Sequence, residues 1–185
     1  MLFRSNKSKS DEDLMVLLQK GDHHAFSIIY NRYADRLNAF FYRMLWSDSQ
    51  IAEDYVHDLF SKIIERPNLY KVGFKVKPWL FQIASNMCKN GYRKKSFEKE
   101  YLSQLEGSGI TESRIEREID EEILTDQIFR TLERMPEERR SMFLLRYQQD
   151  LSVEEVAKIF DVPPGTVKSR LFHIKQTISK TIKDE

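Results

Sequence analysis

The stretch LSVEEVAKIFDVPPGTVKSRLFHIKQTI, residues Leu151–Ile178, is the part of the chain that says most about its fold. Ser152 and Glu155 have the spacing of a capping box, which predicts that a helix begins at this point. Two consecutive prolines at positions 163 and 164 end that helix in a tight turn. A second helix is expected to begin at Gly165. Two helices joined by such a short turn form a helix-turn-helix.

The second helix of this motif has an apolar and a polar face. At the helical period, Val167, Leu171, Ile174 and Ile178 fall on one side and are predicted to pack inward. In a helix-turn-helix this helix enters the major groove, where Phe172 could touch a thymine methyl group and cations could meet phosphates. An ordinary surface helix would explain the cations but not an outward-facing phenylalanine. The predicted DNA-binding residues are Thr166, Lys168, Ser169, Arg170, Phe172, His173 and Lys175.

Helical periodicity dominates the rest of the chain, and the predicted fold class is all-α, with two small helical domains. The starts and ends of the helices are marked by capping residues, glycines and prolines. Helices are expected at about 11–20, 22–46, 50–66, 78–95, 124–135, 137–148, 152–160 and 165–182. We expect a disordered tail at 1–10, a first domain at 11–96, a flexible acidic linker at 97–123 and a second domain at 124–185.

The charges are nearly balanced overall but are segregated along the chain. The sequence has 30 Lys and Arg against 29 Asp and Glu. Eight bases and no acid lie between Arg66 and Phe97, and five bases and no acid lie between Val162 and Lys183. The segment between Glu98 and Asp126 holds ten acids and three bases. Two basic patches separated by an acidic segment suggest two contacts with nucleic acid.

The predicted helix at 78–95 carries the first basic patch. Its core side is expected to contain Leu80, Ala84 and Met87, and a stripe of amides and cations lies opposite. Cations, amides and aromatic rings together suit single-stranded nucleic acid, because bases stack on rings and the backbone meets the cations. Phe81 and Tyr92 would add aromatic surface, although Phe81 fits the core equally well. The predicted contacts are Lys75, Lys77, Trp79, Gln82, Asn86, Lys89, Arg93 and Lys94.

Several classes of function find no support in the sequence. The single cysteine, Cys88, excludes an internal disulfide and suits a reducing cytoplasm. The chain has no apolar run long enough for a membrane span, no signal peptide and no glycine-rich phosphate loop. Asp54 and His57 have the spacing of a di-iron ligand pair, but the sequence offers no second copy. We therefore expect no catalytic residue, no metal and no cofactor.

Four blocks of sequence resemble one known family, in the same order and with similar spacing. They are GDHHAFSIIYNRY, AEDYVHDLFSKIIE, KPWLFQIASNMCKNGYRKK and the long segment LERMPEERRSMFLLRYQQDLSVEEVAKIFDVPPGTVKSRLFHIK. On these blocks the chain resembles the extracytoplasmic-function (ECF) sigma factors, which direct bacterial RNA polymerase to promoters. The resemblance covers nearly all of the sequence from Asp11 to Ile182 except the linker.

The resemblance implies roles that spacing alone does not give. The first domain would be sigma region 2 and the second sigma region 4. The third helix would dock on core RNA polymerase through Asp54, His57, Asp58 and Phe60. The basic helix and its preceding loop would recognise and melt the −10 element, with Asn86 holding a flipped base, and the last helix would read the −35 element. An anti-sigma factor is a further partner compatible with the family.

Three details depart from the family pattern, and one alternative stays open. Arginine is common in the family at the position of His173, a Gln-Glu pair is usual at the position of His57-Asp58, and Leu-Pro is typical at the position of Met135-Pro136. The alternative is a helix-turn-helix regulator that binds an operator without polymerase. That alternative explains the carboxy-terminal domain but not the first basic patch. Dependence of DNA binding on core polymerase distinguishes the two functions.

Overall fold

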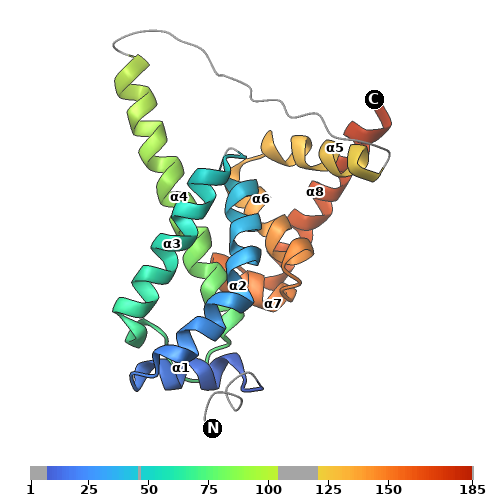
Figure 1. The fold of residues 1–185 in the computed structure, drawn as a ribbon. Helices are drawn as coiled ribbons and strands as arrows, with labels where there is room; N and C mark the ends of the chain where they lie inside the picture. The colour runs from blue at the N-terminus through green and yellow to red at the C-terminus, as the bar shows by residue number, and fades with distance from the viewer. Residues whose placement is uncertain (1–7, 46, 104–120, 185) are drawn as a thin grey trace.

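The computed structural model describes residues 8–45, 47–103 and 121–184, and all regular structure in these ranges is helical (Figure 1). The all-α prediction is therefore confirmed. The helices are α1 Asp11–Gln19, α2 His23–Met44, α3 Ser49–Glu65, α4 Val76–Ser103, α5 Glu121–Glu133, α6 Glu137–Phe143, α7 Val153–Phe160 and α8 Pro164–Asp184, with a 3-10 turn, η1 Pro67–Leu69, and a π-helical turn, η2 Leu144–Gln148.

The predicted helix starts are stabilised by side-chain caps. The Ser10 hydroxyl accepts the backbone N–H of Asp13 at 3.1 Å, and the Asp22 carboxylate accepts that of His24 at 3.0 Å. Ser152 and Glu155 form the predicted capping box. The backbone N–H of Glu155 donates to the Ser152 hydroxyl at 3.1 Å, and the backbone N–H of Ser152 donates to the Glu155 carboxylate at 2.9 Å. Each cap satisfies backbone N–H groups that have no partner within the helix.

Three expectations about the boundaries of helices were wrong. Helix α4 begins at Val76 instead of Pro78, because the carboxylate of Glu12 accepts the Val76 N–H at 3.1 Å. It also continues to Ser103, well into the predicted linker, since no glycine or proline interrupts it after Gly91. The expected helix at 137–148 is divided into α6 and the π-helical turn η2. Of the predicted linker, residues 104–120 lie outside the described residues.

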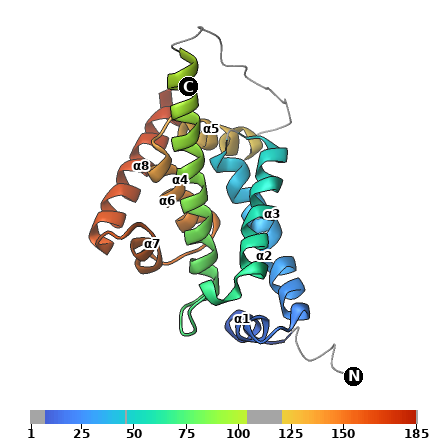
Figure 2. The same cartoon turned by 90° about the vertical axis from the view of Figure 1, so that its left-hand side faces the viewer.

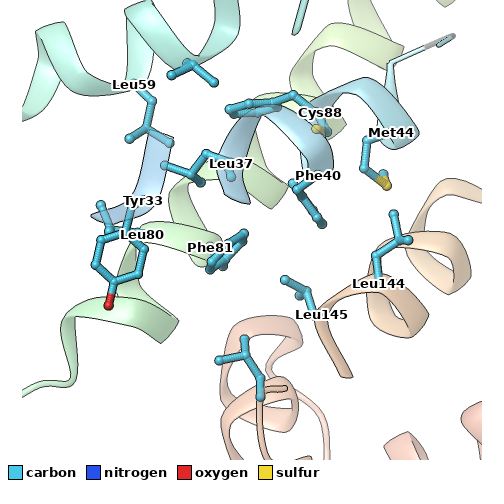
Figure 3. Close-up of a cluster of buried hydrophobic side chains, with 14 of the residues drawn as sticks. Tyr33, Leu37, Phe40, Met44, Leu59, Leu80, Phe81, Cys88, Leu144 and Leu145 are labelled. Carbon is cyan, nitrogen blue, oxygen red and sulfur yellow. The ribbon is translucent and has the colours of Figure 1, made fainter. Parts of the chain in front are cut away.

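The amino-terminal helices α1 to α4 share one apolar core around α2. Leu37 and Phe40 of α2 are completely buried together with Leu59 of α3 and Leu80 of α4 (Figure 3). Phe41 of α2 is also completely buried. Helix α1 crosses one end of this bundle (Figure 2). The core fixes the rotation of α3 and α4 and thereby decides which of their side chains reach the surface.

The carboxy-terminal helices form the predicted helix-turn-helix. Helix α7 ends at Asp161, whose φ of 52° places it in the left-handed conformation that ends many helices. The prolines follow, and α8 begins at Pro164. Val167, Leu171, Ile174 and Ile178 are all buried, as the helical period predicted. The opposite side of α8 therefore faces away from the domain.

The carboxy-terminal helices also pack against the amino-terminal bundle. Figure 3 shows Leu144 and Leu145 of η2 beside Phe40, Met44 and Phe81 of the first domain. All five side chains are buried, and they belong to one continuous hydrophobic cluster. The two groups of helices are thus joined in one body by apolar contacts that the sequence did not predict.

Candidate nucleic-acid interface

The outer face of α8 presents most of the residues predicted for duplex DNA. Lys168, Ser169, His173 and Lys175 are exposed, and Phe172 keeps 55% of its surface accessible. The rings of Phe172 and His173 are 5.6 Å apart and nearly perpendicular, so they form one small aromatic surface. This surface lies among cations and hydroxyl groups, which is the combination needed to contact base edges and phosphates in a major groove.

Two of the predicted residues on α8 are less accessible than the others. Thr166 and Arg170 are half-buried, and Arg170 makes an ion pair with Glu138 of α6. The pairing holds the guanidinium against its own domain. Arg170 therefore offers only part of its donors to a phosphate. Spacing along the chain could not indicate this pairing, because Glu138 lies on a different helix.

Sequence reasoning missed one aromatic residue near this face. Tyr147 of η2 is exposed, and its ring lies 5.9 Å from the Lys175 ammonium and 5.6 Å from the Arg146 guanidinium. Cations near an aromatic ring are attracted by its negative face. Arg146 is the neighbour of Tyr147 in η2, but only the tertiary structure brings Lys175 of α8 to the ring, so spacing in the sequence could not have identified this cluster.

Helix α4 presents the predicted stripe on its solvent side. Gln82, Asn86, Lys89, Arg93 and Lys94 are all exposed, while Leu80, Ala84 and Cys88 on the opposite side are buried. Burial raises the pKa of the Cys88 thiol far above its ordinary value, so it stays protonated and unreactive. The stripe therefore has a rigid apolar support directly behind it.

The loop before α4 adds exposed apolar side chains to this surface. Leu69, Val72 and Phe74 are exposed, Val72 with 67% of its surface, and Gly73 has a φ of 99° that favours glycine. Gln19 of α1 holds the loop by donating to the carbonyl oxygens of Pro67 at 3.1 Å and Tyr70 at 2.7 Å. Exposed apolar groups beside a cationic stripe suit contact with unstacked bases.

Trp79 is only partly available for such contacts. It is half-buried, and its ring packs edge-on against the buried Tyr70 with 5.2 Å between centroids. The remaining face of Trp79 lies next to the stripe along the helix. Trp79 therefore both anchors the loop and borders the stripe.

Two aromatic residues expected on this surface lie elsewhere. Phe81 is completely buried and packs edge-on against Phe40 at 5.6 Å, so the prediction that it adds surface was wrong and its assignment to the core was right. Tyr92 is half-buried, and its hydroxyl donates to the carbonyl of Met44. Burial is the main cause that raises the pKa of Tyr92 to about 12. Both residues hold α4 against α2.

Lys75, which precedes α4, makes an ion pair with the second domain, and Lys77 in the first turn of α4 lies within the electrostatic influence of the same domain. The Lys75 ammonium lies 3.2 Å from a carboxylate oxygen of Glu155, in the first turn of α7. Lys77 is half-buried, and burial followed by the nearby Arg36 lowers its pKa, against the opposing effect of Asp150 and Glu155. Of these two predicted DNA contacts, Lys75 is thus paired with an acid of the helix-turn-helix domain, and Lys77 is influenced by acids of that domain.

Helix α3 exposes Asp54, His57 and Asp58 on one face, as a docking surface requires. The burial of Phe60 contradicts the prediction that this residue contacts polymerase directly, because only 2% of its surface is accessible. It lies beneath Tyr30 of α2, with 4.7 Å between ring centroids, and Tyr30 is the exposed member of the pair. Phe60 therefore belongs to the core, and Tyr30 replaces it as the aromatic group available near this face.

Two further properties concern the described residues alone. Within 8–45, 47–103 and 121–184, no three acidic, histidine or cysteine side chains are grouped closely enough to hold a metal ion. In the same part of the chain, none of the helices combines the length and the apolar character of a bilayer span.

Comparisons with known proteins agree with this arrangement. The family model for Sigma-70 region 2 matches residues 29–98, and the model for Sigma-70, region 4 matches residues 125–178. Among solved structures, the sigma factor RpoE in complex with the anti-sigma factor NepR from Bartonella quintana has a TM-score of 0.70 and 22% identity, covering 85% of this chain and 96% of that one. CnrH in complex with the cytosolic domain of CnrY has a TM-score of 0.71 and 17% identity, covering 96% and 99%.

Curated relatives extend the match over almost the whole chain. The ECF RNA polymerase sigma factor SigW of Bacillus subtilis strain 168 is 26% identical over 178 residues, which is 90% of this chain and 94% of SigW. The ECF RNA polymerase sigma-E factor of Escherichia coli strain K12 is 31% identical over 182 residues, which is 94% of each chain. With both sigma regions present and a relative of this similarity aligned almost end to end, the chain belongs to the ECF sigma factor family.

Proposed function

We propose that this sigma factor binds core RNA polymerase through the exposed face of α3 and directs it to promoters whose two elements are contacted by α4 and α8. The stripe on α4 would bind the non-template strand at the −10 element, with Asn86 taking a flipped base. The outer face of α8 would read the −35 element. This function is non-enzymatic, because the contacts with promoter DNA and polymerase supply the free energy for melting. The protein acts in the cytoplasm, with core RNA polymerase as its partner.

The proposal rests above all on three separate exposed helix faces. The chain has two separate cationic helix faces, and the exposed face of α3, with Asp54 and Asp58, lies on a third helix. A regulator that binds an operator alone needs only the α8 face. The additional stripe on α4, with exposed apolar groups in its loop, suits DNA that is already open. Two similar sigma factors were solved with bound partners, and an anti-sigma partner is therefore part of the proposal.

In vitro transcription tests the proposal directly. Core polymerase is incubated with and without the full chain on fragmented genomic DNA of the source organism, and transcript starts are mapped. We expect discrete new starts that share upstream elements. Tight binding of duplex DNA in the absence of polymerase, without any protein-dependent transcript, would instead support a stand-alone regulator.

Phe172→Ala is expected to weaken −35 recognition at one base pair. Removing an apolar contact with a base costs roughly 1 kcal/mol, which is about a fivefold loss of promoter affinity. The loss should be smaller on a promoter without thymine at that position. Transcription from a panel of single-base −35 variants measures the change. Ser179→Ala, an exposed position near the end of α8, is the matched control. An equal loss on every promoter would contradict a base contact by Phe172.

A further inference from the structure

A shallow hollow borders the outer side of α8, beyond the residues predicted to read DNA. Its volume is about 410 Å³, and it lies between α8 and α6. It is lined by Arg139 of α6 and by His173, Gln176, Thr177 and Lys180 of α8. All of these lining residues are exposed, and none of them is acidic. Because α8 forms one edge of the molecule, the hollow opens to solvent (Figure 2).

The two cations of the hollow come from different helices and have no acidic partner. Within the described part of the chain, neither Arg139 nor Lys180 forms an ion pair. The acid beside Arg139 in the sequence, Glu138, is paired with Arg170 instead. Cations that share one concave surface create a positive potential, and that potential attracts anions. The hollow is therefore suited to a negatively charged ligand.

The neutral side chains of the hollow indicate which kind of anion fits. The Thr177 hydroxyl donates to the His173 carbonyl at 3.0 Å, so its hydrogen is used within the helix. The Gln176 amide offers two N–H donors, and a neutral histidine ring offers one. Together with a guanidinium and an ammonium, these groups present several donors from two helices. A phosphate, whose oxygens accept several charge-assisted hydrogen bonds at once, matches this set of donors.

The position of the hollow along α8 corresponds to the wall of a DNA groove. A helix rises by about 1.5 Å per residue, so Lys180 lies about 16 Å further along α8 than Ser169. The major groove is only about 12 Å wide. With Ser169 and Phe172 at the base edges, as the proposed function requires, Lys180 has passed the bases and reached the sugar-phosphate backbone. His173 belongs to both surfaces, so the hollow continues the base-reading surface without a gap.

We propose that this hollow binds a backbone phosphate of the DNA strand that borders the −35 element, with Arg139 and Lys180 as the ligands. The inference rests on the proposed function, because that function places α8 in the major groove. Contact from two helices fixes the rotation of α8 in the groove and holds Ser169 and Phe172 opposite their bases. A phosphate contact carries no sequence information, so it adds the same affinity on every promoter.

The double variant Arg139→Ala with Lys180→Ala tests the inference in the holoenzyme. Both positions are exposed, so the fold should be unchanged, which circular dichroism checks. The affinity of core polymerase carrying the full chain is measured by fluorescence anisotropy on a responsive promoter fragment, kept cold so that it stays duplex, at several salt concentrations. One phosphate contact contributes about 0.9 to the slope of log affinity against log salt. We expect the slope to decrease by about this amount, which is about a fivefold loss of affinity at about 0.15 M salt, equal for all −35 sequences.

Promoter fragments with one uncharged methylphosphonate linkage identify the phosphate itself. The linkage is moved one position at a time along both strands around the −35 element. At one position we expect the wild type to lose about fivefold in affinity, whereas the double variant loses nothing further, because its contact is already absent. Lys20→Ala with Arg134→Ala is the matched control, since it removes the same two charges at exposed positions outside the hollow. The control should keep the slope of the wild type.

An unchanged slope in the double variant would overturn the inference. A loss of affinity with the same sensitivity as the wild type at every uncharged linkage would also overturn it, because the two cations would then bind an acidic segment of polymerase and not DNA. If wild-type holoenzyme makes no promoter-dependent transcript, the proposed sigma function fails and the inference fails with it. That result differs from an active sigma factor whose hollow contacts no phosphate.

Discussion

Reversing the two carboxylates of α3, Asp54→Lys with Asp58→Lys, is expected to lower transcription at least 100-fold. Both residues are exposed, so the fold should tolerate the change to within roughly 0.5 kcal/mol each. A mismatch of charge within a protein interface costs roughly 2–5 kcal/mol, so two reversals together should cost more than about 2.7 kcal/mol, the equivalent of 100-fold. The loss should therefore appear as weaker binding to core polymerase.

Binding is measured by competition with a fluorescent wild-type chain for core polymerase, and transcription is measured on one promoter. Asp35→Lys, at an exposed acid of α2, is the matched control, since it reverses a charge on another helix of the same domain outside the predicted face. Normal affinity of the double variant for core polymerase would rule out the Asp54 and Asp58 face as the docking surface. A similar loss for the control would show a general effect of charge.

Phe81→Ala is expected to destabilise the protein by about 3–5 kcal/mol, because it removes a completely buried ring that packs against Phe40. For a chain of this size, each kcal/mol lowers Tm by roughly 2–4 °C, so a decrease of about 10 °C is expected. Thermal unfolding followed by circular dichroism gives the measurement. Transcription should fall with the folded fraction and recover at low temperature.

Phe81→Leu separates packing from nucleic-acid contact. Leucine keeps most of the apolar volume and should cost less than about 1.5 kcal/mol. If Phe81 is only a core residue, this variant transcribes as well as the wild type at 25 °C. Loss of promoter melting by Phe81→Leu, with an unchanged Tm, would instead show that the ring contacts DNA and that the original surface interpretation was correct.

The shared interface also explains why neither domain should be considered alone. Leu144 and Leu145 of η2 are buried beside Phe40 and Phe81, so the two domains share apolar surface that each would expose to water on its own.

The sequence by itself determined the features that depend on neighbours along the chain. The capping box at Ser152, the turn at the two prolines and the inward face of α8 follow from spacing, because a helix repeats every 3.6 residues. The outward stripe from Gln82 to Arg93 follows from the same period. The family resemblance rests on these local blocks and was confirmed by the comparisons.

Only the tertiary structure decided what depends on residues far apart in the chain. Phe60 has the sequence context of a docking residue, but Tyr30 covers it from another helix. Lys75 reads as a free cation until Glu155, from the other domain, comes within 3.2 Å. Arg140 connects the ends of two helices from different domains. Burial and pairing are set by three-dimensional packing, and no period along a single helix contains that information.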